Sequence, residues 1–149
     1  MGSGPSAQGP FGLTLTEEYG GLETIVRIAI AGAGYVGLSV ALLLSQRNEV
    51  AIVDVVPGKV DMLRRGESPI RDAEIERFLR GREAMGLSFE ATTDPAEAYA
   101  GADYVVVATP TNYDTDTNSF DTSAVEAAMD AVRAVNPDAW IVVKSTIPV

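Results

Sequence analysis

A short apolar run that ends in a glycine-rich turn constrains the fold of this chain more than any other feature. Residues 28–31 are apolar, and they are followed by Gly32-Ala33-Gly34-Tyr35-Val36-Gly37 and then by a second, longer apolar segment. This order predicts a strand, a tight turn and the N-terminus of a helix. The spacing Gly-x-Gly-x-x-Gly at such a place is typical of a turn that binds a dinucleotide.

Each glycine has a different physical task in a turn of this kind. Gly32 lets the chain leave the strand sharply, Gly34 lets the backbone approach a diphosphate, and Gly37 lets the helix pack closely on the strand. The helix offers free backbone N–H groups and a partial positive charge to phosphate oxygens. Glycine-rich turns also occur by chance, and methyltransferases use a related turn for another nucleotide, so the interpretation depends on the surrounding sequence.

A second apolar run ends in an acidic residue at the distance that a dinucleotide site requires. Residues 49–54 read Glu-Val-Ala-Ile-Val-Asp. They place Asp54 about twenty residues after the glycine turn, where a carboxylate that binds the adenosine ribose is expected. Such a carboxylate repels the additional phosphate of NADP, so the position favours NAD. The alternative is a solvated carboxylate at the end of a strand.

Composition narrows the functional classes. The chain has 149 residues, 46% of them hydrophobic, which suits one domain with a core of its own. Its net charge of −10 makes nucleic acids and anionic membranes poor partners, so phosphate binding has to rely on local donors. The chain contains no cysteine and no histidine. We therefore expect no metal site and no self-contained hydrolase or zinc enzyme.

The first residues differ from the rest of the chain. Residues 1–24 contain Gly2-Ser3-Gly4-Pro5 and Tyr19-Gly20-Gly21, and they are expected to be a flexible natural leader or an artificial extension. They lack the basic start and apolar centre of a secretory signal. No run of about eighteen apolar residues occurs, so no membrane span is expected. The sequence predicts a cytoplasmic protein whose single domain covers residues 25–149.

From Val26 onward, predicted strands and helices alternate. The predicted strands are at residues 26–31, 50–54, 87–92, 104–108 and 140–144. The predicted helices are at residues 35–47, 57–65, 72–80 and 123–135, with a short one that opens at Asp94-Pro95. Ser123 and Glu126 have the spacing of a capping box. Alternating units with apolar strands predict an α/β fold with a doubly wound parallel sheet and the strand order 3-2-1-4-5.

The segment after the fourth predicted strand is the second candidate for a binding site. It reads Ala108-Thr109-Pro110-Thr111-Asn112-Tyr113-Asp114. In an open α/β sheet, ligands bind beyond the carboxyl ends of the strands, where the strand order reverses. Thr109, Thr111 and Asn112 are therefore expected to line the cofactor opposite the glycine turn. The alternative is a polar surface loop, which the same residue types favour.

Another polar segment, Lys144-Ser145-Thr146, follows the fifth predicted strand at the same edge of the sheet. Thr146 offers a hydroxyl that could bind a water molecule or the nicotinamide end of the cofactor. Two alternatives stay open: Thr146 can simply cap the end of the strand, and Lys144 can be an ordinary surface lysine.

Short motifs follow one another from about residue 26 to the end of the chain. They are Gly-Ala-Gly-Tyr-Val-Gly-Leu at 32–38, Val-Asp-x-x-Pro-x-Lys-Val at 53–60, Ser-Pro-Ile at 68–70, Ala-Thr-Pro-Thr-Asn-Tyr-Asp at 108–114, Phe-Asp-Thr-Ser-x-Val-Glu at 120–126 and Lys-Ser-Thr-Ile-Pro-Val at 144–149. In this order they resemble the N-terminal, Rossmann-type NAD-binding domain of the UDP-glucose/GDP-mannose dehydrogenase family. The stretch from Asn112 to Ser123 is most similar to the bacterial UDP-glucose 6-dehydrogenases.

The resemblance implies an oxidoreductase of nucleotide-sugar and polysaccharide synthesis that uses NAD twice. It would take the C6 alcohol of UDP-glucose through the aldehyde level to the carboxylate of UDP-glucuronate, as a homodimer. In this chain Tyr35 and Val36 would touch the cofactor's diphosphate, with Asp54 on the ribose and Lys59 beside it. The glycines of the turn and Thr109 would complete this part of the cofactor site.

The same resemblance assigns two threonines to the other end of the cofactor. Thr111 would line the crevice, and Thr146 would bind near the nicotinamide and orient the catalytic water.

The family's catalytic cysteine, its active-site lysine and asparagine, its UDP-sugar domain and a last strand of the NAD domain are not found up to Val149. That cysteine would hold the sugar as a thiohemiacetal and a thioester. The chain alone is therefore expected to be inactive. Two alternatives remain: the NAD domain of another nucleotide-sugar dehydrogenase, or a stand-alone dinucleotide-binding module.

Overall fold

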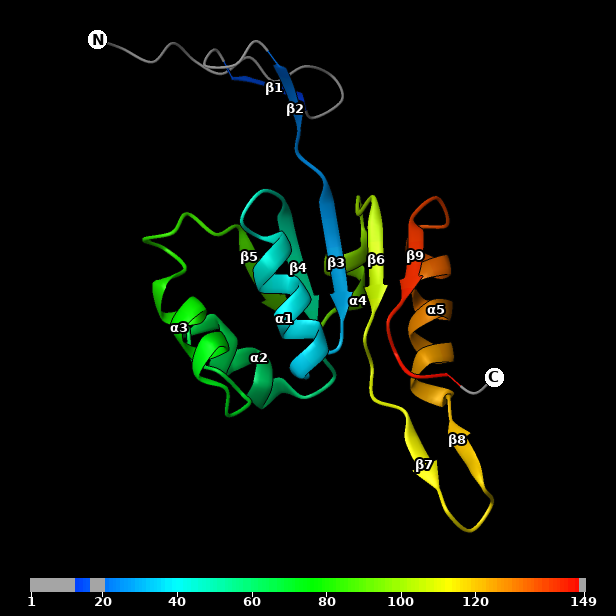
Figure 1. Cartoon of the computed structure of the whole chain (residues 1–149). Helices are drawn as coiled ribbons and strands as arrows, with labels where there is room; N and C mark the ends of the chain where they lie inside the picture. The colour runs from blue at the N-terminus through cyan, green and yellow to red at the C-terminus, as the bar shows by residue number, and fades with distance from the viewer. Residues whose placement is uncertain (1–12, 17–20, 148–149) are drawn as a thin grey trace, which may run out of the picture.

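A parallel sheet forms the centre of the computed structural model, which describes residues 13–16 and 21–147. Its five strands lie in the order β5-β4-β3-β6-β9 (Figure 1). They are β3 (Arg27–Ala31), β4 (Glu49–Val53), β5 (Phe89–Thr92), β6 (Tyr104–Val107) and β9 (Trp140–Val143). This is the predicted order 3-2-1-4-5, so the α/β class with a doubly wound parallel sheet is confirmed.

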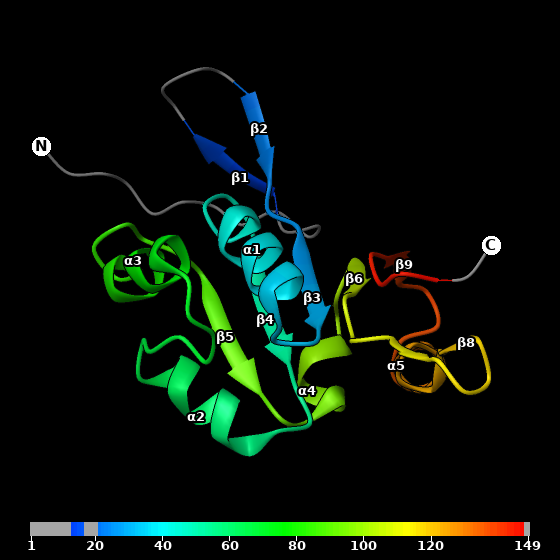
Figure 2. The same cartoon turned by 60° about the horizontal axis from the view of Figure 1, so that its bottom comes forward.

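Helices cover both faces of the sheet (Figures 1 and 2). On one face lie α1 (Tyr35–Leu44), α2 (Pro57–Arg64) and α3 (Ala73–Gly81), and on the other lie α4 (Pro95–Tyr99) and α5 (Ser123–Val135). Side chains alternate along β3, so Ile28 and Ile30 pack under the first group while Ala29 and Ala31 pack under the second. The sheet is therefore apolar on both sides, as its continuous hydrophobic strands predict.

Local signals set most helix boundaries. Pro57 opens α2, and the Asp72 carboxylate accepts the Ile75 N–H at 3.0 Å as the cap of α3. At α4 the Asp94 carboxylate accepts the Ala96 N–H at 2.8 Å. Helix α1 ends at Leu44, earlier than the predicted residue 47, because the N–H groups of residues 47 and 48 both bond to the Leu44 carbonyl and close a turn.

The predicted capping box at α5 is wrong. Thr122 is the N-cap residue, and Ser123 already belongs to the first helical turn. The Thr122 hydroxyl donates to the Glu126 carboxylate at 2.6 Å, and the Asp121 carboxylate accepts the Ser123 N–H at 3.0 Å. The Glu126 N–H, which the capping box would pair with the Ser123 hydroxyl, bonds to the Thr122 carbonyl instead.

Residues 112–121, which the sequence predicts to be part of a loop, form a β-hairpin. Strands β7 (Asn112–Asp114) and β8 (Ser119–Asp121) pair antiparallel, and Asn118 makes the turn with a φ of 51°. The rings of Tyr113 and Phe120 meet edge to face, with centroids 5.0 Å apart. The hairpin projects beyond the carboxyl ends of the parallel strands (Figure 1). Its strands are short and polar, so no apolar alternation marks them in the sequence.

A second small sheet lies within the predicted leader. Strands β1 (Leu13–Thr16) and β2 (Gly21–Thr24) pair antiparallel, and no pattern in the sequence predicts them. Residues 1–12 and 17–20 of the leader, with 148–149 at the other end, lie outside the described residues. Among the described helices, none is both long and apolar enough to span a membrane.

Candidate functional site

The glycine turn connects β3 to α1 at the carboxyl edge of the sheet, and its glycines face different surroundings. Gly32 has a φ of +106°, in the left-handed region that favours glycine, and a Cβ there would lie 2.7 Å from the Ala108 carbonyl oxygen. A Cβ at Gly37 would overlap the carbonyl oxygen of Gly32. At Gly34 a Cβ would meet no atom of the described chain within 4 Å. Two glycines thus let the chain pack on itself, and the third leaves an open surface.

The Asp54 carboxylate, just after β4, braces this turn. Its Oδ2 accepts the Ala33 N–H at 2.8 Å and lies 3.7 Å from the Lys59 ammonium nitrogen. Its Oδ1 accepts the Val56 N–H at 2.9 Å. The side chain is 9% exposed, so it is not the solvated strand-end carboxylate of the alternative reading. A carboxylate has about four lone-pair sites, so it can accept further donors from a ligand.

The segment after β6 forms the opposite wall. The Ala108 N–H donates to the Ala31 carbonyl at 2.8 Å, which continues the pairing of β6 with β3. The Thr109 hydroxyl is buried and has no hydrogen-bond partner among the described residues. Buried polar atoms are nearly always paired, so this hydroxyl is available to a group that binds at this wall.

Two adjoining cavities open along this edge. The larger, about 370 Å³, lies between the glycine turn and the ends of β6 and β9. The other, about 340 Å³, is mostly apolar and lies against α5 and Tyr99. Both are lined by Gly32, Asp54, Lys59, Thr109 and Pro110, so they meet at the ribose-binding carboxylate predicted from sequence.

Most residues predicted for the site gather around the larger cavity. Its lining includes Gly32, Gly34, Tyr35, Val36, Asp54, Lys59, Thr109, Thr111 and Thr146. Gly37 is buried beneath the turn, and Asn112 does not line either cavity but begins the exposed strand β7.

Sequence reasoning missed the wall that α5 contributes. The lining of the apolar cavity includes Ala124, Ala127, Ala128 and Ala131, which share one face of the helix. Their spacing of three and four residues, all with small side chains, is the signal that was available in the sequence. Tyr99 completes this wall from α4, and burial raises the pKa of its hydroxyl to about 12.

The local charge of the larger cavity opposes the charge of the whole chain. The protein has a net charge of −10 and contains two lysines, Lys59 and Lys144. Both line this cavity, with Asp54 as the single carboxylate of its lining. Helix α1 points its N-terminus at the same place, with neither a side-chain cap nor an acidic residue in its first turn. Free N–H groups and two ammonium groups suit a diphosphate.

A doubly wound parallel sheet with this turn and crevice at its topological switch point defines a Rossmann-type dinucleotide-binding domain. Residues 26–149 match the UDP-glucose/GDP-mannose dehydrogenase family, NAD binding domain, and the chain belongs to this family. The predicted family and the predicted cofactor, NAD, are therefore confirmed.

Individual relatives agree with this assignment. The chain is 50% identical over 123 residues to UDP-glucose 6-dehydrogenase of Streptococcus pneumoniae, which covers 83% of this chain and 30% of that protein. It is 38% identical over 128 residues to GDP-mannose 6-dehydrogenase of Pseudomonas aeruginosa, covering 82% and 29%. A UDP-glucose dehydrogenase structure from the archaeon Pyrobaculum islandicum superposes with a TM-score of 0.75 at 30% identity, covering 90% and 31%. The chain thus spans about 30% of the length of these relatives.

Proposed function

We propose that this chain is the NAD-binding domain, residues 25–149 after a leader of 1–24, of a UDP-glucose 6-dehydrogenase. Such an enzyme oxidises UDP-glucose to UDP-glucuronate with two molecules of NAD. The observation that carries the cofactor part is the meeting of the glycine turn, a nearly buried carboxylate and both lysines of the chain at one crevice. The UDP-glucose branch is supported by 50% identity to one such enzyme.

The residues present fit a dinucleotide. Open space at Gly34 and the uncapped N-terminus of α1 would accept the diphosphate, with Tyr35 and Val36 at its side. Asp54 would accept the hydroxyls of the adenosine ribose, and Lys59 would neutralise charge beside it. The apolar cavity against α5 would hold the adenine ring.

The nicotinamide half would then extend toward the ends of β6 and β9. Thr111, which is half-buried, would face it from one wall together with the Thr109 hydroxyl, which has no partner within the described part of the chain. Thr146 would face it from the other wall. When bound, NAD accepts a hydride in each oxidation of the sugar. Thr146 would hold the water that the second oxidation needs. No cysteine is present to carry a thioester, so these residues alone are expected to turn over no UDP-glucose.

Calorimetric titration with NAD tests the assignment of Asp54. Asp54→Ala is expected to weaken NAD binding at least tenfold, since it removes the ribose acceptor and the brace of the turn. Asp72→Ala is the matched control, because Asp72 also accepts a backbone N–H, at 3.0 Å, but in the cap of α3. It is expected to bind NAD within about twofold of the wild type. Equal NAD affinity of wild type and Asp54→Ala would contradict the ribose assignment.

The substrate branch is tested with the full gene product. UDP-glucose, GDP-mannose and a UDP-N-acetylhexosamine are supplied in turn with NAD, and NADH absorbance is followed. UDP-glucose is expected to give the highest kcat/KM. A higher value with another sugar would assign the domain to that branch, and no turnover with any sugar would favour a stand-alone NAD-binding module.

A further inference from the structure

Ser145 ties the ends of two neighbouring strands together. It directly follows Lys144, whose N–H donates to the Val107 carbonyl at 2.8 Å, and its own N–H donates to the same oxygen at 3.2 Å. Its hydroxyl donates to the Thr109 carbonyl at 2.6 Å. The segment after β9 is thus fastened across the end of β6 by a half-buried side chain.

The segment after β6, whose Thr109 carbonyl Ser145 holds, also touches the glycine turn. A Cβ at Gly32 would lie 2.7 Å from the Ala108 carbonyl oxygen and 3.1 Å from the Thr109 backbone nitrogen. The peptide group that joins Ala108 to Thr109 is therefore in contact with the turn, while Ser145 holds the next carbonyl. Thr111 lies two residues after Thr109, and Thr146 directly follows Ser145. The hydrogen bond from the Ser145 hydroxyl to the Thr109 carbonyl therefore affects the positions of both threonines.

We propose that Ser145 is a positioning residue that sets the crevice at its nicotinamide end, by holding the Thr109 carbonyl so that Thr111 and Thr146 face the glycine turn. The proposal rests on the proposed function, since it assumes that NAD occupies the crevice. Ser145 acts through the two threonines and the segment that carries them. Loss of its hydroxyl leaves the Thr109 carbonyl without this donor, while the Lys144 and Ser145 N–H groups still hold the Val107 carbonyl.

The effect is specific to one half of the cofactor. The groups that face the adenosine ribose and the diphosphate are held by other contacts: Asp54 by the N–H groups of Ala33 and Val56, and Gly34 by the start of α1. Ser145 makes none of these hydrogen bonds. ADP-ribose, which lacks nicotinamide, is therefore the diagnostic ligand.

The experiment compares the affinities of wild type and Ser145→Ala for NAD and for ADP-ribose by calorimetry. NAD affinity is expected to fall about fivefold, the effect of losing one well-placed hydrogen bond, and ADP-ribose affinity less than about twofold. Ser68→Ala is the matched control, because the Ser68 hydroxyl makes a bond of the same 2.6 Å length to a carbonyl, that of Ile70, in the loop before α3. It should leave both affinities unchanged.

Equal losses for the two ligands, or an unchanged NAD affinity, would overturn the positioning role. A wild-type chain that binds neither ligand would instead contradict the proposed function. If thermal unfolding shows that Ser145→Ala is not folded, Ser145→Cys carries the test, because a thiol is a weaker donor at the same position. Its ratio of NAD to ADP-ribose affinity is expected to fall, and an unchanged ratio would overturn the proposal.

Discussion

At the scale of single residues, the glycine turn separates the demands of folding from those of binding. Gly32 and Gly37 are surrounded by the chain's own backbone, so a side chain at either position would displace protein atoms. Gly34 has an extended conformation, with φ −90° and ψ −171°, which any residue can adopt, and its Cβ direction is open. The open space beside Gly34 is therefore available to a ligand, and as the N-cap of α1 this position also favours glycine over alanine.

Alanine substitutions at Gly34 and Gly37 are therefore expected to affect different quantities, the first mainly NAD affinity and the second mainly the free energy of unfolding. Gly34→Ala is expected to lower the free energy of unfolding by no more than about 1 kcal/mol, the cost of alanine at the N-cap of α1, but to weaken NAD binding at least tenfold. Gly37→Ala is expected to lower the free energy of unfolding by about 2 kcal/mol or more, because its Cβ overlaps the Gly32 carbonyl. Urea denaturation and calorimetry measure the two quantities. Wild-type NAD affinity in Gly34→Ala would show that no diphosphate lies against this glycine.

At the scale of elements, α4 shows how a short helix is kept in place. It spans Pro95–Tyr99, too few residues to be stable alone. Asp94 caps its start, and Tyr99 at its end is 2% exposed in the core shared with α5. The Asn136 side chain, just after α5, donates to the Tyr99 carbonyl at 3.0 Å and to the Ala102 carbonyl at 2.8 Å. These contacts fix the apolar wall of the crevice.

The burial of Tyr99 predicts a pH dependence of stability. Burial raises the pKa of its hydroxyl from 10.0 to about 12, so the folded state holds this proton more tightly than the unfolded state. The protonated Tyr99 hydroxyl therefore makes its full contribution to the free energy of unfolding below about pH 10. This contribution is lost as the pH rises through about 12. The free energy of unfolding should fall by roughly 2 kcal/mol in this window.

Tyr99→Phe isolates this contribution. Urea denaturation of both proteins at about pH 9 and about pH 11.5 is the measurement, and the wild type should lose roughly 2 kcal/mol more than the variant between them. Equal losses would mean that the Tyr99 hydroxyl titrates as it does in water.

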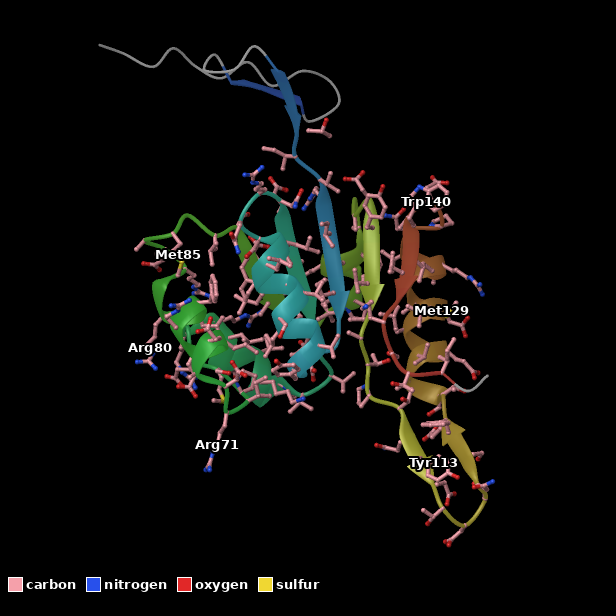
Figure 3. The ribbon with its side chains drawn as sticks, viewed as in Figure 1. Arg71, Arg80, Met85, Tyr113, Met129 and Trp140 are labelled. Carbon is pink, nitrogen blue, oxygen red and sulfur yellow. The ribbon has the colours of Figure 1, made fainter. Side chains whose placement is uncertain are left out.

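At the scale of the whole molecule, the sheet has an open edge at β9 within the described residues. Within the described residues, β9 pairs with β6 on one side and has no strand on the other. Its Trp140 (Figure 3) is the single tryptophan of the chain. This side chain is 72% exposed, and that of Val142 is 42% exposed. An open strand edge beside exposed apolar side chains is a template for pairing with other chains.

These 149 residues are therefore expected to self-associate through β9. Sedimentation at increasing protein concentration should show a rising average mass, and Trp140→Glu should lower it by placing a charge beside the open edge. Met85→Glu is the control: Met85 is 47% exposed, and it lies on the far side of the molecule from Trp140 (Figure 3). A mass that does not change with concentration in the wild type would contradict this role of the edge.

Much of the fold follows from local sequence patterns. Apolar runs placed all five parallel strands, and Pro57, Asp72 and Asp94 marked the starts of three helices, because capping and proline geometry act within a few residues. The hairpin of β7 and β8 escaped this reading. Its strands are held together by backbone pairing and by the contact of Tyr113 with Phe120. A polar run of three residues does not predict such a strand.

By itself, the sequence determined the strand order expected of alternating units, the glycine turn and the distance from that turn to Asp54. The turn and its distance from Asp54 depend on a few consecutive residues, and the strand order follows from the right-handed crossovers expected of such units. Only the tertiary structure decided that the Ala33 N–H meets Asp54, that the two lysines share one cavity in an acidic chain, and that Ser145 reaches Thr109 across 36 positions. Such contacts depend on the register between strands, and register is settled by packing the whole sheet against its helices.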